Sequence, residues 1–104
     1  MEIIRFAKDY PKLQEGLFTT IRTPPKPLRT GTECTIKTPT KEFKAVVVMR
    51  RKYPLCEIET DVLTTDTDTH SREEAMAALR EYYPDLEEDS EVQVLWFVPY
   101  RSGD

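Results

Sequence analysis

The sequence has little of what metal sites, disulfide scaffolds and redox centres need. Its 104 residues hold one histidine, His70, and two cysteines, Cys34 and Cys56, which lie far apart and form no CxxC pair. This set is too small for a zinc site made of protein ligands. We expect both cysteines to be buried free thiols, and a disulfide would need their two strands to be neighbours with suitable geometry. No metal and no cofactor are predicted.

Long apolar runs are also missing. No stretch approaches the roughly 20 apolar residues that a membrane helix requires. The first residues, Met1 to Arg5, do not show the basic and then apolar order of a signal peptide. We therefore expect a cytoplasmic protein with no membrane partner, folded as one domain over residues 1–104 and monomeric.

The charge is unevenly distributed, although the net value is only −4. Residues 1–54 carry twelve Lys and Arg against five Asp and Glu, whereas the remainder carries three against fourteen. The negative total argues against tight non-specific binding to nucleic acid. The division would allow one basic face to meet an anion, unless folding interleaves the two halves and cancels the difference.

Alternation and turn residues predict five or six strands and few helices. A capping box of Ser71 and Glu74 begins the main helix, which should end near Tyr82 before Pro84, with Ala75 and Leu79 on its apolar face. Tyr82 is expected on that same face. A short helical turn is predicted within residues 8–16, and strands at 2–7, 17–22, 33–37, 42–52, 55–63 and 91–99. The predicted fold class is α+β: a small mixed or antiparallel β-barrel with one main helix in the C-terminal half.

The strand Leu17–Arg22 offers the best candidate site. Its alternation would place Phe18, Thr20 and Arg22 on one face and leave the aliphatic side chains on the other. A threonine and an arginine beside an aromatic ring suit a concave site for a polar, planar or anionic ligand, because guanidinium presents a fixed fork of donors. The alternative is an ordinary half-buried strand with an arginine at its end.

A stiff basic loop follows this strand. Residues 23–31 contain three prolines, which hold the segment extended, and they carry Lys26 and Arg29. Such loops often bound ligand sites. A plain crossover between two strands explains the same residues.

The order of these elements resembles the ASCH domain family of the PUA-like superfamily. The matching pieces are Gly16, Thr20-Ile21-Arg22, Gly31-Thr32, Ala45 to Val48, Ser71 to Pro84, and Val94 to Phe97. The resemblance implies a PUA-like pseudo-β-barrel with a cleft where the Thr-x-Arg strand meets the helix. It also implies RNA or a nucleoside as the ligand.

One branch of that family removes the acetyl group of N4-acetylcytidine, chemistry attributed to a lysine shortly before the threonine, the threonine, and a later glutamate. Thr20 matches the threonine, but Leu17 and Phe18 occupy the lysine position, and no lysine lies nearer upstream than Lys12. The loop expected at residues 64–70 offers Asp66 and Asp68 and no glutamate. Because leucine cannot activate a nucleophile, these departures argue against an enzyme.

The sequence therefore predicts a domain that binds RNA or a modified nucleotide. Thr20 and Arg22 would lie in the cleft, with Lys12, Lys26 and Arg29 around it. One alternative is an amidohydrolase that acts on an acylated nucleoside through Thr20 and a displaced base. A second is an acidic cation-binding or protein-interaction domain on the Asp66–Glu91 side, although Asp66-Thr67-Asp68 lacks the glycine and glutamate of an EF-hand.

Overall fold

The structure, a computed structural model, describes residues 2–14, 16–23 and 25–100. It is an α+β fold with five strands, two α-helices and two short 3-10 turns. In chain order the elements are β1 (Glu2–Arg5), η1 (Pro11–Gln14), β2 (Phe18–Arg22), β3 (Glu33–Lys37), β4 (Glu42–Pro54), η2 (Leu55–Glu57), α1 (Thr60–Thr67), α2 (Arg72–Tyr82) and β5 (Glu91–Tyr100).

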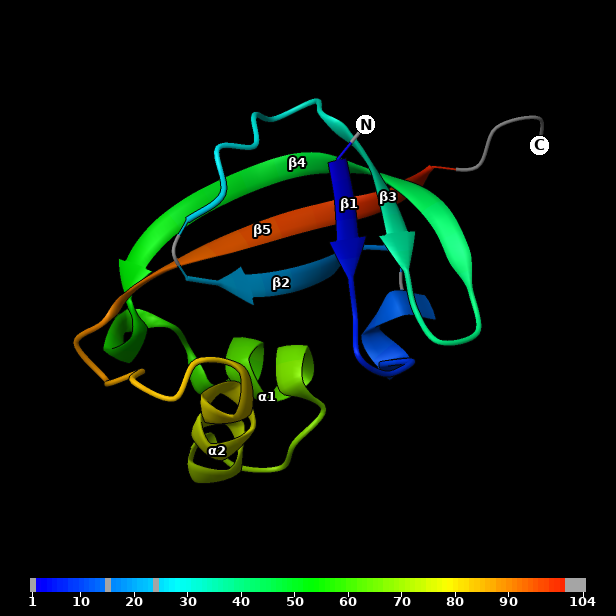
Figure 1. The fold of residues 1–104 in the computed structure, drawn as a ribbon. Helices are drawn as coiled ribbons and strands as arrows, with labels where there is room; N and C mark the ends of the chain where they lie inside the picture. Colours follow the sequence, from blue (N-terminus) through cyan, green and yellow to red (C-terminus); the bar gives the residue numbers. More distant parts are fainter. Residues whose placement is uncertain (1, 15, 24, 101–104) are drawn as a thin grey trace.

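The five strands form one mixed sheet in the order β1-β3-β4-β5-β2. β1 runs parallel to β3, and every other neighbouring pair is antiparallel. The sheet curls into a half-barrel whose edges are β1 and β2, with α1 and α2 packed together below it (Figure 1). The α+β class, the strand number and the mixed sheet predicted from the sequence are confirmed in this coarse form.

The long strand β4 is what bends the sheet. The valine run that predicted either double burial or a bent strand contains a register shift against β5 between Val47 and Met49. Such a bulge adds one residue to one strand and increases the local twist. Ala45 and Val47 are buried on the inner side, whereas Val48 is exposed, so the strand bends and is not covered on both faces along its length.

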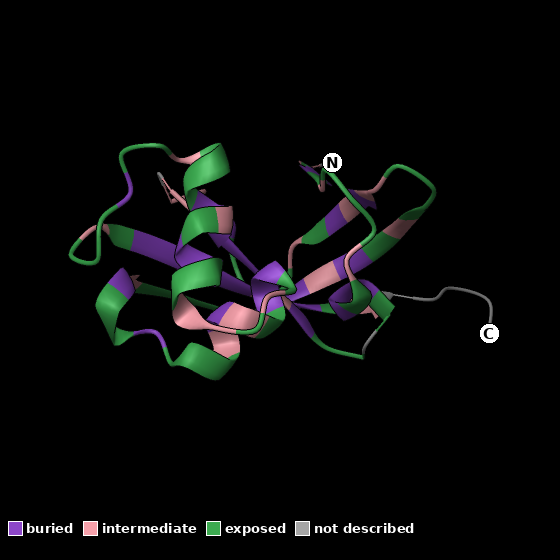
Figure 2. Ribbon diagram, turned by 90° about the horizontal axis from the view of Figure 1, so that it is seen from below, coloured by how far each residue is buried: buried purple, intermediate pink, exposed green. Residues whose placement is uncertain are grey.

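Two apolar clusters lie on opposite faces of the sheet. Figure 2 marks the buried positions along the ribbon. The inner cluster fills the hollow of the half-barrel and includes Phe18, Val47, Leu95 and Phe97, with the Phe18 and Phe97 rings stacked at 5.4 Å. The outer cluster joins the helices to the sheet; its members are Ile21, Leu55, Ile58, Leu63, Ala75, Met76, Leu79, Leu86, Val92 and Val94. Alternate residues of β2 and β5 therefore serve different cores, as a period of two requires.

The prediction of a strand at 55–63 and a polar loop at 64–70 is wrong. Residues 55–57 form η2, and α1 occupies residues 60–67. The helix ends at Asp68, which adopts the left-handed conformation with φ 57°. Its buried residues include two polar ones, Asp66 and Thr67, so the helix lacks the apolar period by which it would be recognised. The protein therefore has two α-helices where one was expected.

The Ser71 cap of α2 is confirmed, whereas the reciprocal bond of Glu74 goes to His70, one residue before the cap. The Ser71 Oγ accepts the Glu74 N–H at 3.1 Å, and the Glu74 carboxylate accepts the His70 N–H at 3.0 Å. The buried face consists of Ala75, Met76 and Leu79. Tyr82, expected on this face, is instead 52% exposed, which places its ring at the surface near the end of the helix.

One of the two cysteines differs from the expectation. Cys34, in β3, is a buried free thiol as predicted, but Cys56 is a free thiol exposed on η2. The burial predicted for Cys56 depended on a strand that does not form. Neither helix of the described residues has the length and apolar composition needed to cross a membrane.

A buried glutamine anchors the proline-rich loop. Gln93, in β5, is 2% exposed, and its side-chain amide forms two hydrogen bonds with Lys26. Its Oε1 accepts the Lys26 N–H at 2.7 Å, and its Nε2 donates to the Lys26 carbonyl at 2.8 Å. The Arg50 guanidinium donates to the Leu28 carbonyl at 2.9 Å. The loop is thus fastened across β5 and β4 and lies over the hollow of the sheet.

Replacing Gln93 by methionine keeps the length of the side chain and removes both hydrogen bonds. We expect Gln93→Met to lower the free energy of unfolding by about 1–3 kcal/mol, because the Lys26 amide and carbonyl lose their partners. Urea unfolding followed by circular dichroism measures this. Gln14→Met is the matched control, because Gln14 is exposed on η1. Equal losses in the two variants would show that the anchor contributes nothing.

Candidate functional site

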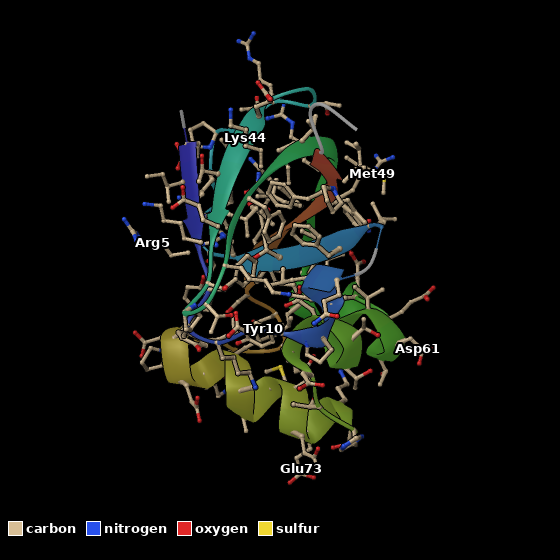
Figure 3. All side chains as sticks on the ribbon, turned by 90° about the vertical axis from the view of Figure 1, so that its right-hand side faces the viewer. Arg5, Tyr10, Lys44, Met49, Asp61 and Glu73 are labelled. Atoms are coloured by element: carbon tan, nitrogen blue, oxygen red, sulfur yellow. The ribbon has the colours of Figure 1, made fainter. Side chains whose placement is uncertain are left out.

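One cleft lies where the edge strand β2, the chain that follows β1, and the C-terminal part of α2 approach one another. It encloses about 120 Å³. Tyr10, one of its lining residues, lies between the sheet and α2 (Figure 3). Its lining is Arg5, Phe6, Ala7, Tyr10, Lys12, Thr20, Ile21, Arg22, Asp66, Thr67, Ala78, Leu79, Tyr82 and Tyr83.

β2 supplies the polar residues that the sequence singled out. Phe18, Thr20 and Arg22 stand opposite Phe97, Leu95 and Gln93 of β5, all on the inner face, whereas Ile21 packs in the outer cluster. The predicted alternation of this strand is therefore present. Thr20 is 5% exposed and Arg22 half-buried, and both line the cleft.

Arg22 has a buried donor that no described residue accepts from. Its Nε is the one buried side-chain nitrogen or oxygen among the described residues that lacks a hydrogen-bond partner. The described ion pairs give its guanidinium no carboxylate either. An unpaired buried donor costs about 1–3 kcal/mol, so a ligand acceptor placed against it would gain that interaction without breaking another.

A buried ion pair forms the wall beside Thr20. The Lys12 Nζ, on η1, lies 2.9 Å from Asp66 Oδ1, on α1, and the two side chains are 3% and 6% exposed. The Thr19 hydroxyl donates to the same Oδ1 at 2.7 Å. The pair therefore joins three elements that are far apart in sequence, and it accounts for a polar residue on the buried face of α1.

Aromatic rings surround the Lys12 ammonium. The ring centroids of Phe6 and Tyr10 each lie 5.0 Å from Nζ, within the range of a cation–π interaction. Burial lowers the pKa of Lys12 from its ordinary 10.5; the attraction and hydrogen bond of Asp66 oppose this, and the charge of Arg22 adds to it. Burial also raises the pKa of Tyr10, helped by the adjacent Tyr82 hydroxyl. The Lys12 ammonium thus lies in a buried environment of mixed aromatic and charged groups.

The five residues predicted for the site divide into two groups. Lys12, Thr20 and Arg22 come together in the cleft. Lys26 instead forms an ion pair with Glu2 at 3.0 Å, and Arg29 is exposed; neither lines the cleft. The loop that carries them is held over β5 and β4 by Gln93 and Arg50, away from the edge of β2.

Several lining residues were not found from the sequence. Asp66 was assigned to a loop, Tyr82 to the core, and Arg5 and Tyr10 to no site. The one sequence signal for this part of the site is the adjacent polar pair Asp66 and Thr67. Both are buried in α1, where Asp66 meets a charged partner. Among the residues that the structure describes, no group of three or more His, Cys, Asp or Glu is arranged to hold a metal ion.

No protein-family model and no solved structure matches the chain. The chain is similar to Uncharacterized protein MJ0364 of Methanocaldococcus jannaschii, with 39% identity over 69 residues. The match covers 62% of this chain and 60% of that relative, so less than two thirds of the relative's length is spanned. The name of this relative states no activity. The geometry of the cleft is therefore what indicates a function.

Removing one partner of the buried pair should be far more harmful than removing both. We expect Asp66→Asn to lower the free energy of unfolding by about 3 kcal/mol or more, because it leaves the Lys12 charge buried without its carboxylate. The double variant Lys12→Met with Asp66→Leu should recover most of this loss. Urea unfolding measures both, with Asp68→Asn as the control, since Asp68 is exposed at the end of the same helix.

The loss in Asp66→Asn should also depend on pH in a defined direction. The folded-state pKa of Lys12 is already below 10.5 and falls further without Asp66. The unfolded chain then binds more protons than the folded one, so the stability of the variant rises as the pH approaches 10.5. The measurement is the difference in unfolding free energy between the unmodified protein and Asp66→Asn. A difference that stays constant from neutral pH to about pH 9.5 would contradict a buried, charged Lys12.

Proposed function

We propose that the protein binds RNA or a modified nucleotide by taking one nucleobase into the cleft beside β2. The Nε of Arg22 carries this proposal, because it is a buried donor without a partner among the described residues and belongs to a residue that lines the cleft. A carbonyl of a base edge would satisfy it, and the Thr20 hydroxyl lies on the same face of the strand to meet a second polar atom.

The size and chemistry of the cleft support a single base as the occupant. Its volume of about 120 Å³ is well below the roughly 300 Å³ at which sites for drug-sized ligands begin. Phe6, Tyr10, Tyr82 and Tyr83 contribute aromatic surface next to the charged groups. Aromatic side chains beside arginine are typical of proteins that stack and read unpaired bases.

The resemblance to the ASCH family supports the same class of ligand. The cleft lies where that resemblance implies, between the Thr-x-Arg strand and the helices, and the half-barrel is compatible with a PUA-like fold. The second alternative named in the sequence analysis, an acidic cation-binding domain, has less support. Three of its carboxylates already have a cationic partner: Asp66 forms an ion pair with Lys12, Glu87 with Arg80, and Glu88 with Arg72.

Arg22→Ala should weaken binding to single-stranded RNA of random sequence at least tenfold, about 1.4 kcal/mol, and leave the fold intact. The reason is that the variant loses a donor inside the cleft. Fluorescence anisotropy of a labelled oligonucleotide measures the affinity. Arg29→Ala is the control, because it removes the same charge from an exposed position outside the cleft. If both variants bind like the unmodified protein, Arg22 has no role in the site.

One observation favours hydrolysis as a second function. The fold brings Lys12, Thr20 and Asp66 to the same cleft, although neither charged residue occupies its expected place in the sequence. A hydroxyl that shares a cleft with an ammonium–carboxylate pair could serve as a nucleophile if it came within reach of that pair, with the carboxylate accepting a proton and the ammonium stabilising a developing oxyanion. The substrate would be an acylated nucleoside such as N4-acetylcytidine.

Incubation with N4-acetylcytidine tests this second function. We expect release of cytidine and acetate, measured by chromatography, and a loss of at least a hundredfold in rate for Thr20→Val, about 2.7 kcal/mol. Thr65→Val, on the exposed side of α1, controls for the change of side chain. The absence of product at high protein concentration would reject hydrolysis and would leave the binding proposal standing.

A further inference from the structure

We propose that the ligand carries a phosphate group and that Arg5, at the rim of the cleft, binds it. This inference rests on the proposed function and makes it narrower: the cleft takes a nucleotide, free or within a strand, in preference to a nucleoside. Arg5 would then be the residue that distinguishes the two, a role separate from that of Arg22.

The volume of the cleft decides where the phosphate must lie. A space of about 120 Å³ is filled by one nucleobase and leaves no room for the sugar and its phosphate. Thr20 and Arg22, through which the base would be held, are buried and half-buried on the inner face of β2. The rest of a nucleotide must therefore extend through the opening and past the residues at the rim.

The charges of the lining call for an anion. Its charged residues are Arg5, Lys12, Arg22 and Asp66. Lys12 and Asp66 neutralise each other at 2.9 Å, which leaves two guanidinium groups with no carboxylate partner in the described ion pairs. Guanidinium holds phosphate through paired donors, so an arginine left without a counter-charge at a ligand site is well suited to it.

Arg5 is positioned for the part of the ligand that lies outside. It is the last residue of the edge strand β1, and the chain that follows it, Phe6 and Ala7, continues along the lining. The Arg5 side chain is exposed and projects outward from β1 (Figure 3). It is therefore accessible to a group that lies outside the cleft, and the described ion pairs give it no carboxylate.

Two further charged residues lie near the opening, and their signs oppose each other. The Lys8 ammonium lies over the Tyr10 ring, 4.7 Å from its centroid. The Glu81 carboxylate is close enough to contribute, after burial, Tyr82 and Asp66, to the raised pKa of Tyr10. Lys8 and Glu81 thus place opposite charges around Tyr10, and neither of them lines the cleft as Arg5 does.

The experiment compares each common ribonucleoside with its 5′- and 3′-monophosphates by isothermal titration calorimetry. We expect at least one monophosphate to bind tenfold or more tightly than its nucleoside. Arg5→Gln should reduce this ratio below threefold, because it weakens the binding of the monophosphate more than that of the nucleoside. Arg51→Gln, which removes an exposed arginine of β4 outside the cleft, should keep the full ratio. Added salt should reduce the ratio only where Arg5 is present.

The outcomes separate this inference from the proposed function. Equal affinities for nucleosides and monophosphates, together with a loss of RNA binding in Arg22→Ala, would overturn the phosphate site alone. A ratio that Arg5→Gln leaves unchanged would overturn the assignment to Arg5. Failure of every nucleoside, every monophosphate and RNA to bind would overturn the proposed function and this inference together.

Discussion

The ion pair between Lys12 and Asp66 is the interaction on which the arrangement of this protein depends. Taking two charges out of water costs several kcal/mol for each ion unless they are paired and hydrogen-bonded. Lys12 meets this requirement with Asp66 and two aromatic rings, and Asp66 meets it with Lys12 and Thr19. Since these groups come from η1, β2 and α1, the requirement sets where the turn and the helix sit against the edge strand. The cleft exists because those three elements meet there.

The same pair explains which part of the fold the sequence could predict. β2, β5 and α2 were readable because each carries its own signal: alternation in the strands and a capping box with an apolar face in the helix. Residues 55–67 carry a misleading signal, because their sequence alternates like a strand but forms helices. Ile58 and Val62 alternate with acidic residues as in a half-buried strand, and the helix that forms buries Asp66, a residue that no periodicity rule places inside. Only the position of Lys12 makes that burial favourable, and Lys12 is 54 positions away.

The site was predictable to a similar extent. The alternation of β2 correctly placed Thr20 and Arg22 on one face, because it needs nothing beyond the pleat of a strand. The remaining lining depends on which elements approach the edge of that strand. Lys26 and Arg29 were assigned to the site for their charge and their closeness in sequence, but Gln93 holds their loop over a different part of the sheet. Arg5, Tyr10 and Tyr82 enter through tertiary packing alone.

The pairing of β2 with β5 has a consequence for the order in which the molecule can be built. Thr20 faces Leu95 across the ladder, and β2 has no other neighbour in the sheet. A ribosome delivers the first of these strands long before the second, and contacts between distant parts of a chain form late because closing a long loop is entropically costly. Until β5 arrives, the edge strand has no partner, and Arg22 and Thr20 have no hollow to face. During synthesis the cleft beside β2 is therefore among the last features to appear.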